Sequence, residues 1–259
     1  MASSHGKFVW YELMTSDPAA AEIFYQTVIG WETNDAGMPG MAYTILSAGG
    51  VGVGGIMELP DDAREAGAKP GWLGYIGVDD TDAATRKVAD AGGAIHKVPM
   101  DIPGVGRFSV VADPQGAAFV LFAPNMAMPD EPPDTTQPGH GGWRELRATD
   151  SAAALGFYAE MFGWAQIDAL DMGPMGLYRL FAGPGAEGPI GGIMTKTPDI
   201  PRPYWLYYFN TASIGAAAAR VAQAGGQVIA PPMPVPGGGW VLHAFDPQGA
   251  MFALVAPAE

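Results

Sequence analysis

Cysteine is absent from this sequence of 259 residues. A chain without thiols forms no disulfide bond, no thiolate nucleophile and no cysteine-ligated metal site. Proteins of reducing compartments commonly lack disulfides, so we expect a cytoplasmic protein. The opening residues, Met1–Gly6, contain no basic segment followed by an apolar one, and therefore do not resemble a signal peptide.

Basic residues are also scarce, with 13 Lys and Arg against 27 Asp and Glu and a net charge of −14. Nucleic-acid binding depends on basic side chains that neutralise phosphates, so we expect no nucleic-acid partner. The same acidity disfavours binding to an anionic membrane surface. No apolar run reaches the roughly 18 residues needed to span a bilayer, so we expect no membrane partner.

What the sequence contains is a long internal repeat at a spacing of 133 residues. The matched pairs are Trp10 with Trp143, Glu12 with Glu145, Phe24-Tyr25 with Phe157-Tyr158, and Asp113-Pro-Gln-Gly-Ala117 with Asp246-Pro-Gln-Gly-Ala250. Such a repeat indicates two copies of one domain. We predict a first domain at 6–124, a proline-rich linker at 125–140 and a second domain at 141–257.

A fainter repeat divides each copy into two modules, because Trp10 and Trp72 lie 62 residues apart, as do Trp143 and Trp205. Its register is uncertain by one residue, since Asp17 can match Asp79 or Asp80. Each module begins with an aromatic-rich strand, continues with a helix that an aspartate can cap, and ends with further strands. The glycine-rich stretch Gly49–Gly55 is interpreted as a tight hairpin.

These motifs resemble the vicinal oxygen chelate superfamily, which includes glyoxalase I, extradiol dioxygenases and bleomycin-resistance proteins. The resemblance rests on Asp17-Pro-Ala-Ala-Ala-Glu-Ile-Phe-Tyr25 with Gly30-Trp31, on Val78–Ala84, and on Asp113–Phe122. It implies an α+β fold of two tandem domains. In each domain, paired βαβββ modules form an open, cupped, mixed sheet. It also implies either a monomer with an internal pseudo-dimer or a homodimer.

Enzymes of this superfamily hold a divalent metal through histidine, glutamine and glutamate. Carried over by position, the resemblance puts these ligands at Trp10, Trp143, Trp72 or Leu73, Trp205 or Leu206, Val120, Ala253, Met57 or Glu58, and Met194 or Thr195. Apart from Glu58, these side chains are not ordinary metal ligands. We therefore expect a metal-independent protein with no cofactor. The four histidines, His5, His96, His140 and His243, are interpreted as solvated or structural.

The candidate catalytic residues are Glu12 and Glu145, which recur at the same place in the first strand of each copy. A carboxylate on a partly apolar strand face can act as a general base or bind a ligand, although a structural ion pair is the alternative. The candidate ligand-binding residues are aromatic: Trp10, Trp72, Tyr75, Trp143, Trp205 and Tyr208, with Tyr43 and Tyr178 as weaker candidates. For the tryptophans, core packing is an equal alternative.

The sequence therefore predicts a small-molecule-binding protein that holds a hydrophobic or aromatic ligand against its sheets without a metal. The alternative is an enzyme of the superfamily, a glyoxalase-type lyase or a dioxygenase, that depends on a metal or on Glu12 or Glu145. A protein without any ligand is a third possibility.

Overall fold

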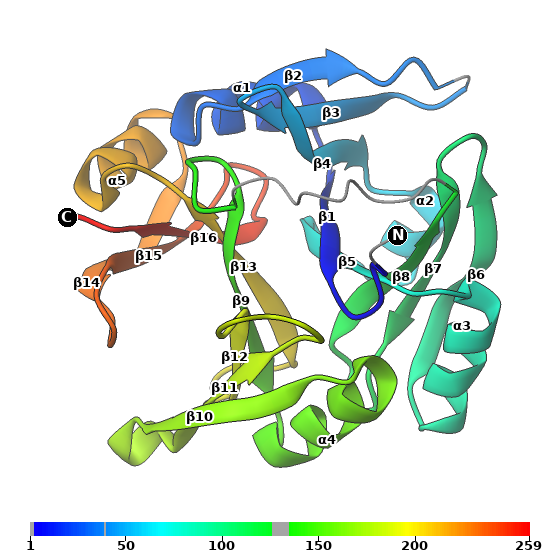
Figure 1. The fold of residues 1–259 in the computed structure, drawn as a ribbon. Coiled ribbons are helices and arrows are strands. Elements are labelled where there is room, and N and C mark those ends of the chain that lie inside the picture. Colours follow the sequence, from blue (N-terminus) through cyan, green and yellow to red (C-terminus); the bar gives the residue numbers. More distant parts are fainter. Residues whose placement is uncertain (1–2, 39, 126–134) are drawn as a thin grey trace. The chain divides into compact units, whose positions relative to one another are not determined.

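A computed structural model describes residues 3–38, 40–125 and 135–259, and residues 126–134 of the predicted linker lie outside it. The first copy contains β1 (Phe8–Thr15), α1 (Pro18–Val28), β2 (Glu32–Asp35), β3 (Tyr43–Ala48), β4 (Val51–Glu58), α2 (Asp61–Glu65), β5 (Gly71–Gly77), α3 (Thr81–Asp90), β6 (Ala94–Ile102), β7 (Gly106–Ala112) and β8 (Ala118–Pro124) (Figure 1).

The second copy repeats this order. It contains β9 (Gly141–Ala148), α4 (Ser151–Phe162), β10 (Ala165–Asp171), a short 3-10 helix (Gly173–Met175), β11 (Leu177–Ala182), β12 (Gly191–Thr195), β13 (Tyr204–Asn210), α5 (Ile214–Gln223), β14 (Gln227–Pro234), β15 (Trp240–Phe245) and β16 (Met251–Ala256). Among the described residues, no helix is long and apolar enough to cross a membrane.

Every module has the βαβββ connection. The first strand is followed by a helix, and the last strand pairs parallel to the first, as β4 does with β1 and β16 with β13. The intervening strands pair antiparallel, as in β2-β3-β4 and β14-β15-β16. The strand orders are β2-β3-β4-β1-β5-β8-β7-β6 and β10-β11-β12-β9-β13-β16-β15-β14. The predicted α+β fold of two tandem domains with open, mixed eight-stranded sheets is confirmed.

The helix caps decide the register of the repeat inside each copy. The side chains of Asp17 and Asp80 accept backbone N–H groups at the starts of α1 and α3, and Asp150 and Ser213 do the same for α4 and α5. The offset is 80 − 17 = 63 in the first copy and 213 − 150 = 63 in the second. The module equivalent of Trp10 is therefore Leu73, not Trp72.

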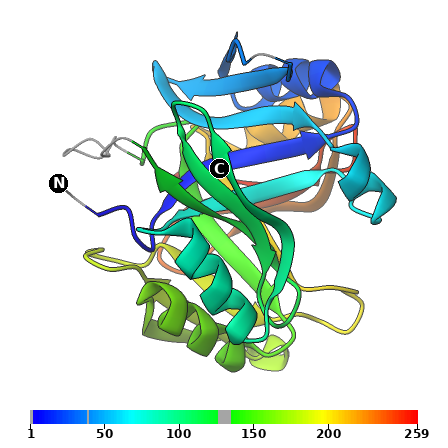
Figure 2. The same cartoon turned by 90° about the vertical axis from the view of Figure 1, so that its right-hand side faces the viewer.

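The chain divides into two compact units, and the divisions run through β1, β5, β9 and β13. The first unit contains α3 with β6–β8 and α4 with β10–β12. The second contains α1 with β2–β4 and α5 with β14–β16. In Figure 2, α3 and α4 lie side by side, and Figure 1 shows α5 along β14, β15 and β16. Each unit thus combines one module from each copy.

Aromatic side chains fill the core of each unit. In the second unit Tyr25 packs on Trp72 at 5.2 Å between ring centroids, and Trp72 packs on Phe209 at 5.0 Å. In the first unit Trp164 stacks on Phe181 at 4.5 Å and on Tyr158 at 5.1 Å. Burying a large apolar side chain contributes about 1.5–3 kcal/mol, so these clusters are a major source of stability for each unit.

Candidate functional site

Alternate residues of β1 lie on opposite faces of the sheet. Leu13 and Thr15 are fully buried, and Tyr11 packs on Phe209 at 5.6 Å between centroids, within the cluster that includes Tyr25 of α1. This is the face on which the helices pack. Trp10 and Glu12 therefore lie on the opposite face, which we call the helix-free face.

Glu12 is only 4% exposed on the helix-free face and is held there by a tyrosine. Tyr43 Oη donates a hydrogen bond to Glu12 Oε2 at 3.0 Å. Trp10 Nε1 in turn donates to Tyr43 Oη at 2.9 Å. The three side chains, from β1 and β3, form a relay of hydrogen bonds that ends on a buried carboxylate.

The glycines of β4 make this relay possible. A Cβ at Gly55 would lie 2.3 Å from Tyr43 Oη, and one at Gly52 would lie 3.3 Å from Trp10 Cζ3. The rings of Tyr43 and Trp10 therefore lie over strand positions that have no side chain. The interpretation of Gly49–Gly55 as a hairpin accounts for Gly49 and Gly50, which have positive φ angles, but not for the glycines inside the strand.

Burial and the negative charge of Glu12 raise the pKa of Tyr43 far above its usual value. Burial is the larger of the two causes, because a phenolate shielded from water loses the solvation that would stabilise its charge. Tyr43 therefore stays protonated at every physiological pH and remains a hydrogen-bond donor to Glu12.

The second copy repeats the arrangement with one added charge. Glu145 is 5% exposed, and Tyr178 Oη donates to its Oε2 at 3.0 Å. A Cβ at Gly192 would lie 2.2 Å from Tyr178 Cζ, so this glycine corresponds to Gly55. Arg147 Nε donates to Glu145 Oε1 at 2.5 Å. The structural ion pair that the sequence left as an alternative is therefore present at Glu145.

Trp143 precedes Glu145 by two residues on β9, as Trp10 precedes Glu12 on β1, so the strand alternation places it on the helix-free face. Trp72 and Trp205 lie on the other face, and each is 6% exposed. Trp72 Nε1 donates to Tyr25 Oη at 2.9 Å and Trp205 Nε1 donates to Tyr158 Oη at 2.9 Å. The structure does not bring these two tryptophans together with the glutamates, and their ligand-binding role stays a prediction that their placement disfavours.

The tyrosines beneath these tryptophans bind the aspartates of the two Asp-Pro-Gln-Gly turns. Tyr25 Oη donates to Asp246 Oδ2 and Tyr158 Oη donates to Asp113 Oδ2, both at 3.1 Å. Burial raises the pKa of both aspartates, although backbone N–H donors of their own turns lower it. The recurrent Asp-Pro-Gln-Gly motif is therefore a buried contact between modules as well as a turn.

Tyr75 and Tyr208 alternate with buried helix-side residues and lie on the helix-free face, 5% and 3% exposed. Tyr75 packs on Phe122 at 5.9 Å between ring centroids. Tyr208 Oη lies 2.9 Å from His243 Nε2. The sequence interpretation of His243 as solvated or structural missed this pairing. The sequence signal that could have found it is the difference between the copies, because Val110 occupies the position of the first copy that matches His243.

The positions that the family resemblance assigns to a metal do not fit one. Val120 lies in register with Tyr75 on the next strand, and Ala253 lies in register with Tyr208. Over the part of the chain that the structure describes, no three His, Cys, Asp or Glu side chains gather closely enough to hold an ion. Divalent metals need several nitrogen, oxygen or sulfur donors, which these aliphatic side chains do not offer.

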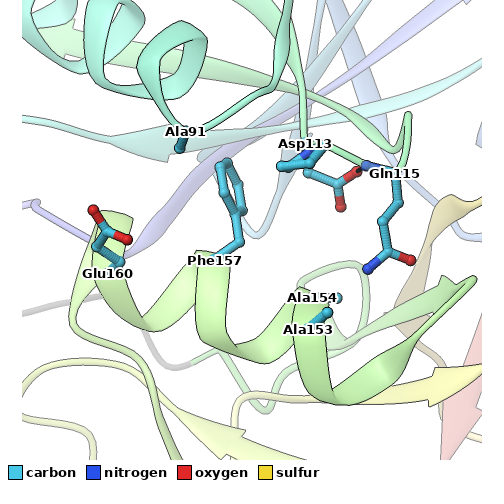
Figure 3. A pocket seen from close by; sticks show the side chains of 8 residues that line it. Ala91, Asp113, Gln115, Ala153, Ala154, Phe157 and Glu160 are labelled. Carbon is cyan, nitrogen blue, oxygen red and sulfur yellow. Dashed lines mark hydrogen bonds between the residues drawn. The ribbon is translucent and has the colours of Figure 1, made fainter.

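A pocket of about 300 Å³ opens in the first unit, away from these residues (Figure 3). Phe157 and Ala154 of α4 line it, together with Ala91 at the end of α3 and Asp113 in the turn after β7. Its lining includes none of the predicted site residues, and it belongs to the layer of helices. We therefore take the helix-free face as the candidate site.

Comparison with known proteins gives a consistent result. The family model described as Glyoxalase/Bleomycin resistance protein/Dioxygenase superfamily matches residues 7–121 and 139–254. A protein named "Putative glyoxylase CFP32" from Mycobacterium tuberculosis is 36% identical over 96% of this chain and 94% of its own length. "Anthracycline biosynthesis protein DauV" from Streptomyces sp. is 31% identical over 98% of this chain and 94% of its own length.

Solved structures resemble the fold at low sequence identity. A Mn(II)-bound glyoxalase from Novosphingobium aromaticivorans has a TM-score of 0.65 at 17% identity, covering 99% of this chain and 83% of that chain. The 2,3-dioxygenase LapB from Pseudomonas sp. KL28 has a TM-score of 0.66 at 13% identity, covering 99% of this chain and 93% of that chain. At these identities the likeness concerns the fold alone.

Proposed function

The chain belongs to the Glyoxalase/Bleomycin resistance protein/Dioxygenase superfamily, and from that premise we propose that it binds a small, flat aromatic molecule on the helix-free faces of its sheets without a metal ion. The observation that carries this proposal is the relay from Trp10 through Tyr43 to the buried Glu12. It puts aromatic rings beside one polar anchor, which is the usual composition of a small-molecule site.

Three properties of the relay support binding. The rings of Trp10 and Tyr43 lie over glycine positions, so they present flat surfaces for stacking. The carboxylate of Glu12 accepts hydrogen bonds and therefore favours a ligand that donates them. The same tyrosine–glutamate pair recurs at Tyr178 and Glu145, so each copy has the means to bind.

Aliphatic and aromatic side chains at the expected metal positions support independence from metal. Val120 and Ala253 stand where the resemblance expects a glutamate, and neither can donate to an ion. The relatives named anthracycline biosynthesis proteins support a fused-ring aromatic ligand as the class to test first.

The test is a titration with 2,6-dihydroxyanthraquinone, a flat molecule whose hydroxyl groups can donate to Glu12 and Glu145, followed by quenching of tryptophan fluorescence in protein dialysed against EDTA. We expect saturable binding that Tyr43→Phe and Tyr178→Phe together weaken about tenfold, since each removes the donor that orients a glutamate. Trp72→Phe, on the other face, is the matched control and is expected to leave the affinity unchanged. Absence of binding, or an affinity that the double variant does not alter, would refute the proposal.

A second candidate is an enzyme that uses Glu12 or Glu145 as a general base, because a buried carboxylate next to a fixed tyrosine donor is suited to proton transfer. The test is turnover of the hemithioacetal of methylglyoxal and glutathione with EDTA present. If this candidate is correct, turnover of the hemithioacetal disappears in the double variant Glu12→Gln/Glu145→Gln. A rate that persists in this double variant would remove it.

We further propose that this function is carried out in the cytoplasm by a monomer, with no nucleic-acid or membrane partner. The acidic charge and the lack of cysteine support this setting. Sedimentation equilibrium would test the oligomeric state, and a mass of twice 26.9 kDa would contradict it.

A further inference from the structure

The pocket of about 300 Å³ beside α4 combines apolar walls with a buried acid (Figure 3). Its walls include the ring of Phe157 and the methyl groups of Ala91, Ala153 and Ala154. Small-molecule pockets commonly have volumes of about 300–1,000 Å³, so this one suits a ligand with a single ring. All of its lining residues belong to the first unit and lie in the layer of helices, away from the helix-free face.

The buried acid is Asp113, which is only 2% exposed. Its Oδ1 accepts the backbone N–H groups of Gln115 at 2.8 Å and Ala117 at 3.0 Å, whereas its Oδ2 accepts one hydrogen bond, from Tyr158 Oη at 3.1 Å. Each carboxylate oxygen has two lone pairs, so Oδ2 can accept a further donor. Figure 3 shows this carboxylate between the side chains of Gln115 and Phe157.

The charged side chains of the lining are both acidic. Glu160 of α4 is the second of them, and none of the described residues that line the pocket is Lys, Arg or His. Lys87, outside the lining, donates to the backbone oxygen of Glu160 at 2.6 Å. Burial raises the pKa of Asp113, because its ionised carboxylate has little contact with water. A cation in the pocket therefore stabilises the ionised form, and an aromatic ring such as that of Phe157 attracts a cation over its face.

The second unit repeats the buried aspartate, as Asp246, but differs around it. The equivalent phenylalanine, Phe24, lies against Gly226, where an added Cβ would be 2.8 Å from its Cε2 atom. Thr27 stands in the place of Glu160. The divergence of the copies has therefore given the first unit a second carboxylate beside the buried one.

We propose that the pocket beside α4 binds a small organic ammonium ion with an apolar body, held by the carboxylate of Asp113 and the ring of Phe157. This second site goes beyond the proposed function, because it lies on the helix side and requires no ligand on the helix-free face. The ammonium group supplies the donor that Asp113 Oδ2 can accept, and such charge-assisted hydrogen bonds are about twice as strong as neutral ones. Ala153 and Ala154 leave the space for the apolar body.

The experiment compares benzylamine, which is an ammonium ion at neutral pH, with benzyl alcohol, which has nearly the same shape and no charge. Each probe is titrated into the isotope-labelled full chain, and the shifts of amide signals in nuclear magnetic resonance spectra give the affinity. We expect benzylammonium to bind about tenfold more tightly than benzyl alcohol, because only the ammonium ion makes a charge-assisted hydrogen bond to the carboxylate.

Three variants locate the binding. Ala153→Leu fills the pocket from an exposed position of α4 and is expected to weaken benzylammonium binding about tenfold. Ala20→Leu makes the same change at the matching position of α1 in the second unit and is expected to leave the affinity unchanged. Asp113→Asn keeps the shape of the side chain without its charge and is expected to reduce the preference for benzylammonium to less than about threefold.

Thermal unfolding by circular dichroism identifies any variant that does not fold, and Ala153→Leu, at an exposed helical position, then decides. Equal affinities for the two probes, or no binding of either, would overturn the proposal. Binding of benzylammonium that neither Ala153→Leu nor Asp113→Asn weakens would also overturn it, because the cation then binds elsewhere. Failure of 2,6-dihydroxyanthraquinone to bind would refute the proposed function and leave this inference standing.

Discussion

At the scale of single residues, the central feature of each copy is a buried carboxylate that accepts a hydrogen bond from a tyrosine hydroxyl. Glu12 and Glu145 are almost completely buried, and an unpaired charge in that setting costs several kcal/mol. Tyr43 and Tyr178 each donate to one carboxylate oxygen. The tyrosine hydroxyl groups therefore stabilise the fold and also orient the glutamates.

Tyr43→Phe removes one donor from a buried carboxylate while keeping the ring. We expect it to lower the free energy of unfolding by about 1.5–3 kcal/mol, the usual value of a hydrogen bond to a charged group. Urea denaturation measures this change. Tyr43→Phe combined with Glu12→Gln is expected to recover part of the loss, and a combined loss equal to the sum of the single losses would contradict the pairing.

The buried aspartates give a dependence of stability on pH. Burial raises the pKa of Asp113 above that of an aspartate in water, so the folded chain holds the proton more tightly than the unfolded chain. Its contribution to stability is therefore full below the unfolded-state pKa and is lost as pH rises through the higher folded-state pKa. The stability difference between wild type and Asp113→Asn is expected to decrease over that interval.

Urea unfolding at pH steps from about 4 to about 7 measures this difference for wild type and for the variant. Asp90→Asn makes the same substitution at an exposed position of α3 and serves as the surface control. A difference that grows as pH rises would show that Asp113 is stabilised as the anion, in contradiction of the burial effect.

At the scale of elements, glycines inside β4 and β12 create the space that the site needs. A Cβ at Gly55 would meet Tyr43 Oη at 2.3 Å, whereas a Cβ at Gly52 would meet Trp10 Cζ3 at 3.3 Å. The first contact cannot be accommodated unless Tyr43 moves, and the second requires only a small shift of the indole.

Gly55→Ala is therefore expected to lower the free energy of unfolding by about 1–3 kcal/mol and to weaken ligand binding, because it displaces the ring that orients Glu12. Gly52→Ala is the matched control and is expected to cost less than about half as much. Thermal denaturation and fluorescence titration of both variants test the difference. Equal effects of the two substitutions would contradict the role given to Gly55.

Strand faces show how far the sequence could predict the site. The repeat predicted the modules correctly, but pairing Trp10 with Trp72 at a spacing of 62 was one residue short of the spacing that the helix caps give. A shift of one residue moves a strand side chain to the opposite face. Trp72 and Trp205 therefore pack under the helices, and Leu73 and Leu206 take the positions that correspond to Trp10 and Trp143.

At the scale of the whole chain, the duplicated architecture could be predicted because identical motifs recur over long stretches. The contacts that build the site could not, because they join residues distant in sequence. Tyr43 meets Glu12 across 31 residues, and Tyr208 meets His243 across 35. The first copy has valine, and no histidine, at the position that matches His243, and His243 was therefore interpreted as solvated or structural. A difference between duplicated copies is itself a signal that a residue has a separate role.

Ligand binding by this chain is expected to need the helix-free face and no metal. The most direct measurement is calorimetric titration of 2,6-dihydroxyanthraquinone into EDTA-dialysed protein, repeated after addition of Mn²⁺. We expect the same affinity and the same stoichiometry with and without the metal. Binding that occurs only after Mn²⁺ is added would contradict it.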